Sequence, residues 1–309
     1  MCVRTHGNLD MKTVKLKAKT KDYLWGGHKL FDYGKDGNDI IAESWELSFF
    51  EGMESLIDSG SDKGKKLSEV VTEKELGSNI KKYQFFPMLA KLIDSNQDLS
   101  IQVHPNDEYA RKYENSYGKN EMWYVVDSDE GAMLYIGFNK DVSKEEIEKR
   151  IENNTLVDVM NHILVHPGDA YYIPAGTIHA IGKGCLIFEI QQNSNITYRV
   201  YDYGRRDKNG YLRELHVKKA LDVLNLKKME PYNMRNEPEI RNKPFFAKEE
   251  ENLKSIKATK ESFKAITVLS GEGFVDDIPC KKGDTFFIPA GEEAIIKGNI
   301  RVYLYSIDE

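Results

Sequence analysis

Four polar residues in this chain of 309 could together form a site for a divalent metal ion: Gln102, His104, Glu121 and His179. Gln102 and His104 are two positions apart in the alternating segment 99–104, so both side chains lie on one face of a predicted strand. Glu121 opens the next β-type run, and His179 follows a Pro-Ala-Gly corner that would direct it into a barrel mouth. Two imidazoles with a carboxylate and an amide oxygen suit zinc, and an open coordination position would hold a water for chemistry.

An internal repeat explains how such a site is supported. Residues 168–176 read GDAYYIPAG and residues 283–291 read GDTFFIPAG, with six of nine positions identical. The pattern predicts a Gly-Asp turn, a half-buried aromatic strand, a Pro-Ala-Gly corner and a return strand. Two copies indicate two barrels built from one β-unit. Ala294 in the second copy stands where His179 stands in the first, so the second barrel is predicted to be structural.

The remaining pattern predicts a mostly β protein with a few short helices. β-Type runs occur at 14–18, 99–104, 123–126, 133–136 and 186–190, and helical patterns at 67–75, 143–164 and 214–226. The helix at 143 opens with a capping box, Ser-Lys-Glu-Glu. We expect a leader at 1–10, a metal-binding first barrel with helical insertions at 11–235, and a degenerate second barrel at 236–309. A charged stretch with three prolines, 228–245, marks the connector.

Composition narrows the possible partners and compartment. The net charge of −6 disfavours nucleic acid, because phosphate-backbone binding needs a basic face. No apolar run approaches the roughly 18 residues of a membrane span, and the N-terminus lacks a signal-peptide core. Three cysteines that are far apart and odd in number argue for reduced thiols. We therefore expect a cytoplasmic protein without membrane or nucleic-acid partners.

Four ordered motifs resemble the type I mannose-6-phosphate isomerases, most closely their short bacterial branch, within the cupin superfamily. They are DLSIQVHPND (98–107), GKNEMWYVV (118–126), HPGDAYYIPAGTIHAIGKG (166–184) and FEIQQNSNITYRVYDYGR (188–205). The segments LWGGHKL (24–30) and AESWELS (42–48) resemble the family's N-terminal signatures. The resemblance covers about residues 11–226 in motifs, and the degenerate barrel extends it to the end. It implies two cupin-type jelly-roll barrels and a sugar-phosphate substrate, in a monomer or homodimer.

Carried over by position, the resemblance implies the same four zinc ligands, Gln102, His104, Glu121 and His179, around one Zn²⁺ per chain. It places the family's catalytic arginine at Arg199, an acidic residue at Glu189 and a lysine near the zinc glutamate at Lys119. It also places Ser100 and Lys91 near the sugar phosphate. This chain departs from some members at Asn195, where they carry an aspartate, so no acid/base role is assigned there.

The implied reaction interconverts mannose 6-phosphate and fructose 6-phosphate by moving a proton between C1 and C2. Zinc would polarise the carbonyl or orient the sugar, and Arg199 would stabilise the enediolate. Glu189, Lys119 and a zinc-bound water are the candidate bases. Two other functions stay open at this point: a metal-dependent cupin of other chemistry, such as an iron dioxygenase, and a sugar-binding cupin without catalysis.

Overall fold

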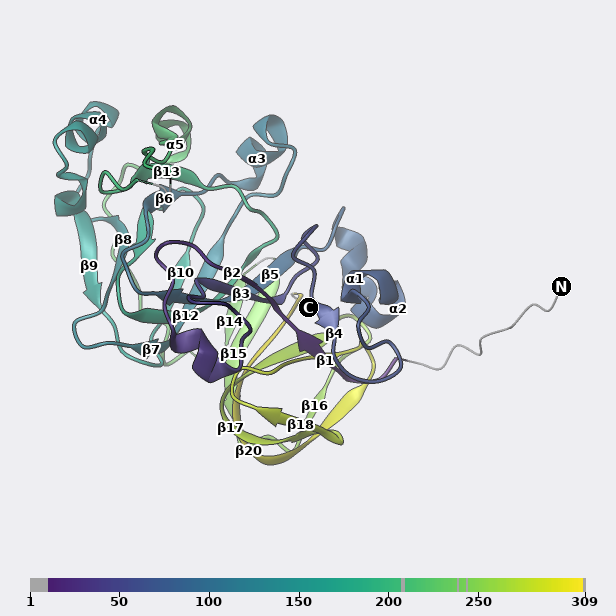
Figure 1. Cartoon of the computed structure of the whole chain (residues 1–309). Coiled ribbons are helices and arrows are strands. Elements are labelled where there is room, and N and C mark those ends of the chain that lie inside the picture. The colour runs from purple at the N-terminus through teal and green to yellow at the C-terminus, as the bar shows by residue number, and fades with distance from the viewer. Residues whose placement is uncertain (1–10, 207–208, 238, 243, 308–309) are drawn as a thin grey trace.

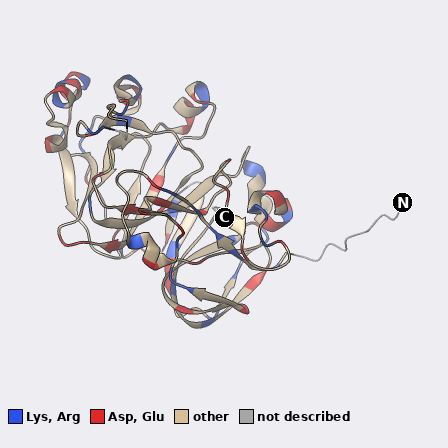
Figure 2. Ribbon diagram, viewed as in Figure 1, with Lys and Arg blue, Asp and Glu red and all other residues tan. Residues whose placement is uncertain are grey.

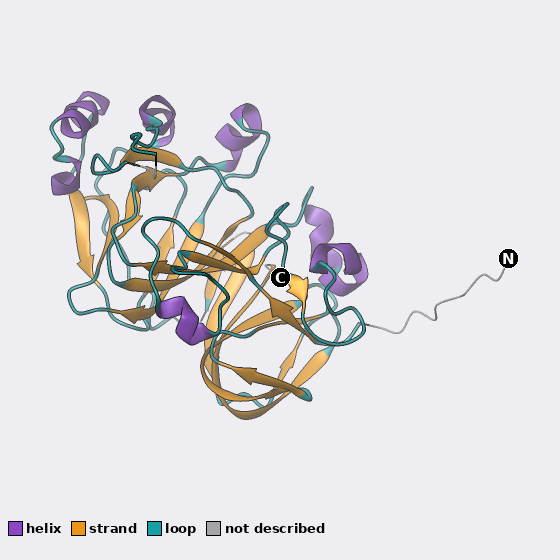
Figure 3. Cartoon of the chain, in the orientation of Figure 1, coloured by secondary structure: helices purple, strands orange, loops and turns teal. Residues whose placement is uncertain are grey.

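The computed structural model describes residues 11–206, 209–237, 239–242 and 244–307, and these form mostly β-structure with short helices. Two barrels lie against each other, with the metal-ligand candidates in the barrel that carries α3, α4 and α5 at its outer end (Figure 1). The short helices lie outside the strands, at the outer end of the first barrel and beside the sheets, and none lies around the lower end of the second barrel in this view (Figure 3). The predicted fold class is confirmed, whereas the predicted leader at 1–10 lies outside the described residues.

The first barrel consists of a six-stranded and a five-stranded antiparallel sheet. The larger sheet has the order β10 (Ala170–Ile173), β7 (Glu121–Ser128), β12 (Cys185–Gln192), β5 (Met88–Ser95), β3 (Glu43–Leu47) and β2 (Lys19–Lys21). The smaller sheet has the order β13 (Tyr198–Tyr201), β6 (Ile101–Val103), β11 (His179–Ile181), β8 (Met133–Phe138) and β9 (Met160–Leu164). Metal-ligand candidates therefore come from both sheets.

The second barrel is a nine-stranded sheet that also recruits two strands from the N-terminal region. Its strands are β14 (Ile240–Asn242), β15 (Phe245–Glu251), β16 (Ser255–Lys257), β17 (Lys264–Val275), β18 (Ile278–Lys281), β19 (Thr285–Ile288) and β20 (Glu293–Ile307), with β1 (Val14–Lys17) and β4 (Leu56–Ile57). β1 pairs with β19, so the chain starts in one barrel and then builds the other. The domain division at 235 stays a prediction, and this pairing adds an N-terminal contribution to the second barrel.

Alternation along β7 explains how the two barrels join. Trp123 and Val125 pack in the core of the first barrel, while Met122, Tyr124 and Val126 pack in a separate cluster with residues of the second barrel. Period-2 geometry sends successive side chains to opposite faces of a strand. β7 is therefore buried on both faces, one toward the site and one toward the other barrel.

The internal repeat has the same local structure in both copies. Gly168 and Gly283 have φ angles of 94° and 91°, a conformation that favours glycine. In each turn the aspartate side chain accepts a hydrogen bond from the backbone N–H three residues earlier, at 2.8 Å for Asp169 and 2.9 Å for Asp284. The two sequences therefore fold into equivalent turn–strand–corner units, as predicted.

All three predicted helices differ in extent from the sequence pattern, and the one predicted at 214–226 is shortened to α5 (Val217–Val223). The segment from 143 forms α4 (Lys144–Glu152) with Ser143 as N-cap, but the chain leaves the helix because Asn154 adopts a φ of 57°. η3 (Leu156–Val159) and β9 follow instead of more helix. The segment from 67 splits at Thr72, which caps the second helix. The helical elements are η1 (Lys29–Tyr33), α1 (Leu67–Val70), α2 (Glu73–Leu76), η2 (Ser78–Lys82), α3 (Asp107–Tyr113), α4, η3 and α5 (Val217–Val223).

The surface carries both signs of charge. Basic and acidic residues are interspersed over both barrels in the view of Figure 2. No helix in the described ranges is both long enough and apolar enough to cross a membrane.

Candidate metal centre and adjoining pocket

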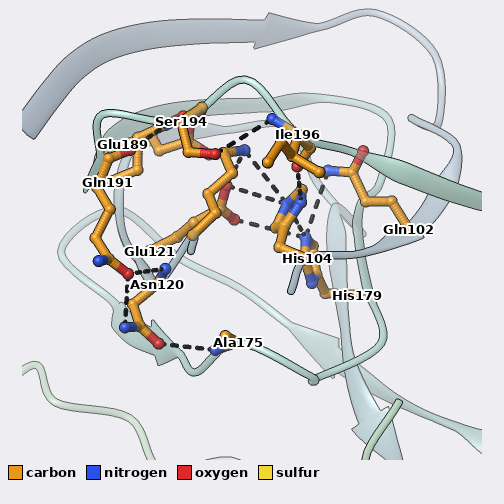
Figure 4. Close-up of polar contacts among 12 residues, drawn as sticks. Gln102, His104, Asn120, Glu121, Ala175, His179, Glu189, Gln191, Ser194 and Ile196 are labelled. Atoms are coloured by element: carbon orange, nitrogen blue, oxygen red, sulfur yellow. Dashed lines mark hydrogen bonds and ion pairs between the residues drawn. The ribbon is translucent and has the colours of Figure 1, made fainter. Parts of the chain in front are cut away.

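The four predicted ligands converge inside the first barrel. Gln102 on β6 stands directly opposite His179 on β11, and His104 follows β6 at once. Glu121 is the first residue of β7 in the facing sheet. Figure 4 shows the Glu121 carboxylate and the two imidazoles pointing toward one another, with Gln102 beside them. Strand pairing within one sheet and closure by the other therefore bring together residues that are distant along the chain.

The distances are those of a compact ligand cluster. His104 Nε2 and His179 Nε2 are 3.2 Å apart. Glu121 Oε1 lies 3.3 Å from His104 Nε2, and Oε2 lies 3.5 Å from His179 Nε2. The Gln102 amide nitrogen is 3.4 Å from His179 Nε2, and a half-turn of the amide exchanges its nitrogen and oxygen. The donor atoms of the histidines and Glu121 all lie within 4.8 Å of one another.

Both histidines present a lone pair to the centre of the cluster. His104 Nδ1 lies 2.7 Å from the Ile196 carbonyl oxygen, and His179 Nδ1 lies 2.8 Å from the Thr177 carbonyl oxygen. A carbonyl only accepts, so each Nδ1 carries the proton and each Nε2 is unprotonated. Burial lowers the pKa of both imidazoles, to about 3 for His179, which keeps them neutral. Two lone pairs facing each other repel unless a cation lies between them.

Glu121 supplies the negative charge of the cluster. It is fully buried, and neither carboxylate oxygen has a hydrogen-bond partner. Burial alone would raise its pKa, but the positive charge of Lys119, which lies beside Oε1, and the contact with His104 hold that pKa well below its usual range. An ionised buried carboxylate without a hydrogen-bond partner, next to two imidazole lone pairs, fits a divalent cation.

A pocket of about 320 Å³ adjoins the cluster. Six of the nine predicted site residues line it: Lys91, Ser100, Gln102, Lys119, Glu189 and Arg199. The other three, His104, Glu121 and His179, are buried beside Gln102 and Lys119. The structure therefore brings all nine predicted residues into one region. Asn195, the departure noted in the sequence, also lines the pocket.

One wall of the pocket holds a lysine between two anchored carboxylates. Lys91 Nζ lies 3.8 Å from Glu43 Oε1 and 3.6 Å from Glu189 Oε1. The second oxygen of each carboxylate accepts from an indole N–H, Trp45 for Glu43 at 2.8 Å and Trp123 for Glu189 at 2.9 Å. Burial and the charge of nearby carboxylates raise the pKa of Glu189. Burial opposes the Lys91 charge, but the surrounding carboxylates raise its pKa.

Two arginines also line the pocket. Arg199 on β13 donates from Nη1 to the Glu214 carbonyl oxygen at 2.8 Å, and its Nε is buried without a partner. Arg213 contacts Asp202 at 3.4 Å, but Asp202 also pairs with Arg205. Burial and the neighbouring Arg213 charge lower the pKa of Arg199. Around these arginines the pocket has more positive than negative charge among its described residues.

Comparisons with known proteins identify the family. Residues 13–138 match the model of the phosphomannose isomerase type I catalytic domain. The chain is 37% identical over 291 residues to mannose-6-phosphate isomerase ManA of Bacillus subtilis, an alignment covering 89% of this chain and 92% of that protein. The chain belongs to the type I mannose-6-phosphate isomerase family. It is therefore an enzyme that interconverts mannose 6-phosphate and fructose 6-phosphate, as the sequence motifs implied.

Solved structures agree with this membership of the isomerase family. The crystal structure of mannose 6-phosphate isomerase from Bacillus subtilis superposes with a TM-score of 0.84 at 33% identity, over 96% of this chain and 99% of that one. A mannose 6-phosphate isomerase bound with zinc and yttrium shares the fold, with a TM-score of 0.74 at 14% identity over 97% of this chain and 100% of that one.

Two charged residues of this isomerase pocket, Glu43 and Arg213, were not predicted from the sequence. Glu43 belongs to the AESWELS segment, where a charged residue between buried ones on a strand was the available signal. Arg213 lies in a segment without periodicity, and nothing in the sequence pointed to it. Only the folded chain brings these two residues into one pocket.

Proposed function

We propose that this isomerase depends on one zinc ion per chain, held by Gln102, His104, Glu121 and His179. The observation that carries the proposal is the pair of facing Nε2 lone pairs beside the buried Glu121 carboxylate, which has an ion-pair partner in Lys119 but no hydrogen-bond partner. Zinc accepts imidazole nitrogen and carboxylate oxygen, and a zinc-bound relative shares the fold. Neither an iron dioxygenase nor a sugar-binding protein without catalysis is favoured once the family is known.

Charge balance suggests where the substrate phosphate binds. Lys91 is matched by Glu43 and Glu189, and Lys119 by Glu121. Arg213 has only Asp202 as an ion-pair partner, which Arg205 also contacts, and the Arg199 Nε has no hydrogen-bond partner. Because guanidinium groups bind phosphate through several donors, we place the phosphate at Arg213 and leave Arg199 for the charge that develops on the sugar. Lys91 and Ser100 then contact the sugar itself.

The pocket residues can transfer the proton and stabilise the charge that the reaction develops. The bound metal would supply Lewis acidity and orient the sugar oxygens. Glu189, whose pKa is raised by burial, takes the proton from C2 on its Oε1 and returns it to C1, while the O2 hydroxyl proton passes to O1 so that the carbonyl moves from C1 to C2. Lys119 lies 3.3 Å from His104 Nε2 and is the second candidate base. Arg199 holds the negative charge of the enediolate with its guanidinium donors.

A metal-depletion assay tests the proposal. Turnover of mannose 6-phosphate, coupled to detection of fructose 6-phosphate, should stop with a chelator and return on addition of zinc. Recovery with iron alone and not with zinc would overturn the zinc assignment, and full activity of metal-free protein would overturn the metal dependence.

An Arg213→Met variant tests the phosphate placement separately. Loss of a charge-assisted hydrogen bond costs about 1.5–3 kcal/mol, so KM for mannose 6-phosphate should rise by roughly 10- to 150-fold. A larger effect of Lys91→Met on KM would move the phosphate to Lys91.

We propose the cytoplasm as the working compartment. Cys185 and Cys280 are free thiols in the interior, which suits a reducing environment. A monomer or homodimer without nucleic-acid or membrane partners stays a prediction.

A further inference from the structure

The proposed metal ligands come from three chain segments that are tied together by side-chain amides. His104 is followed closely by the start of α3, Glu121 follows the loop 118–120, and His179 follows the Pro-Ala-Gly corner. Asn120 and Ala175 lie beside Glu121, apart from the two imidazoles (Figure 4). The hydrogen bonds there connect backbone N–H groups of the second and third segments, through Asn120 and Gln192, to the Asp107 side chain of the first.

Asn120 joins the second segment to the third. It stands between Lys119 and Glu121, and its Oδ1 accepts from the backbone N–H of Ala175 at 2.8 Å. Ala175 lies in the corner, four residues before His179. The Asn120 side chain therefore fixes the spacing between the start of β7 and the corner that leads into β11. Its Nδ2 donates to Gln192 Oε1 at 2.8 Å.

Gln192, at the end of β12, joins the second segment to the first. Its Oε1 also accepts from the backbone N–H of Asn120 at 2.9 Å, and its Nε2 donates to Asp107 Oδ1 at 3.1 Å. The same Asp107 oxygen accepts from the Gly118 N–H at 2.8 Å. The Gln192 side chain is only 5% exposed, so few water molecules can replace these bonds. We call Asn120, Gln192 and Asp107 the amide clasp.

The second barrel shows that the fold does not require this clasp. Phe263 precedes β17 as Asn120 precedes β7, and Ile307 ends β20 as Gln192 ends β12. Both are fully buried in an apolar cluster. The second Pro-Ala-Gly corner forms nonetheless, with its Ala290 N–H donating to the backbone oxygen of Glu75 at 2.8 Å. The polar clasp is therefore particular to the barrel with the metal ligands.

We propose that Asn120 and Gln192 are positioning residues that set the spacing of the three ligand-bearing segments, and so the affinity of the site for zinc. This inference rests on the proposed zinc dependence. The clasp touches neither the pocket nor a ligand side chain in any printed hydrogen bond, so it acts through backbone placement alone. Outer-shell partners of metal ligands typically contribute 10- to 100-fold in affinity.

The test compares zinc affinity in two matched variants of the full chain. Gln192→Met removes the clasp at similar volume. Asn193→Leu removes a buried amide one residue along, which donates only to the Phe86 carbonyl oxygen at 2.9 Å and joins no ligand segment. Competition with a chromogenic chelator measures the zinc dissociation constant, and thermal unfolding of the metal-free proteins measures stability. Gln192→Met should raise the dissociation constant by about tenfold or more, and Asn193→Leu should leave it unchanged at a comparable loss of Tm.

If Gln192→Met does not fold, Gln192→Glu replaces it in the measurement of zinc affinity. It keeps the acceptor for Asn120 and replaces the donor to Asp107 with a like charge, so a smaller rise in the dissociation constant is expected. Unchanged zinc affinity in the folded Gln192 variant, or an equal loss in Asn193→Leu, would overturn the positioning role while leaving the zinc proposal intact. A wild-type protein that is active and binds no zinc would overturn both.

Discussion

The two barrels share a backbone plan and differ in what fills it. Glu121 pairs with Ile173 in the first barrel, and Lys264 pairs with Ile288 at the equivalent place in the second. His179 stands opposite Gln102 in the first, whereas the second barrel pairs two apolar residues, Ala294 and Ile256. At three of the four ligand positions the second barrel therefore has lysine, alanine and isoleucine, and these described residues offer no equivalent of the first barrel's ligands.

The pocket wall shows the same substitution of polar by apolar groups. Trp123 and Glu189 form a cross-strand pair in the first barrel, and Ile266 and Leu304 form it in the second. Ile266 and Leu304 pack with Ala294 and Ile256 in one apolar cluster. The backbone of a cupin barrel therefore supports either a polar site or an apolar core, and a few interior residues decide which. A polar barrel interior contains buried groups that need hydrogen-bond or ion-pair partners, whereas an apolar core contains no such groups.

The largest effect is expected from making the first barrel resemble the second at one position. His179→Ala copies Ala294, removes a proposed ligand and relieves the lone-pair repulsion with His104. Zinc affinity should fall by more than about 100-fold, since even outer-shell partners contribute 10- to 100-fold. Isomerase activity should fall with it, while Tm of the metal-free protein changes little. Metal analysis, a coupled assay and calorimetry check the three parts, and retention of zinc would contradict the ligand assignment.

Arg199→Ala separates catalysis from metal binding. Arg199 lies on β13, which follows β12 in the first barrel. β20 is the equivalent of β12 in the second barrel, and no further strand follows it among the described residues. Removing a charge-stabilising donor typically costs about 10²–10³ in kcat. Turnover should fall by that amount with zinc content unchanged. Parallel loss of zinc and turnover would make Arg199 a structural residue.

The reverse exchange, Ala294→His, tests whether the second barrel can accept a polar group. The imidazole would enter an apolar cluster without a partner, and the added volume would strain the packing. Unfolding free energy should fall by about 2–4 kcal/mol, with kcat of the folded protein unchanged. Urea denaturation gives the free energy. Zinc binding in the second barrel of this variant would contradict the view that Lys264 and Ile256 exclude it.

The smallest effect concerns pH. Burial raises the pKa of Glu189 above the ordinary 4.5, and a base must be ionised to act. As pH falls through the raised pKa, activity should therefore decline at a higher pH than for an exposed glutamate. In Glu189→Gln the residual activity should lose this acidic limb in a profile of kcat/KM. An unchanged limb would assign the base to another group, with Lys119 next to be tested.

Local sequence patterns predicted much of the framework. β6, β7, β8 and β12 fall on runs recognised from alternation or apolar content, because burial of one or both strand faces leaves that signature. The helix from 143 was overextended because periodicity does not register the left-handed turn at Asn154. The pairing of β1 with β19 was not predictable, since no local pattern encodes which distant strand is the partner.

Site residues that lie in sequence motifs were predicted. Site residues that come together only through the tertiary structure were not. Gln102 and His104 share a strand face, and the two repeat copies differ in having His179 in the first and Ala294 in the second. The sequence alone therefore suggested these ligands. Arg213 reaches the pocket from an irregular segment, and Gln192 reaches Asn120 from a strand end. These contacts depend on tertiary geometry, which spacing along the chain does not determine.

Anomalous diffraction at the zinc absorption edge, on crystals of fully active protein, tests the central claim most directly. We predict one zinc peak per chain in the first barrel, bonded to His104, Glu121, His179 and the Gln102 amide oxygen, and none in the second barrel. A peak elsewhere, or fully active crystals with no metal between the two histidines, would contradict the account.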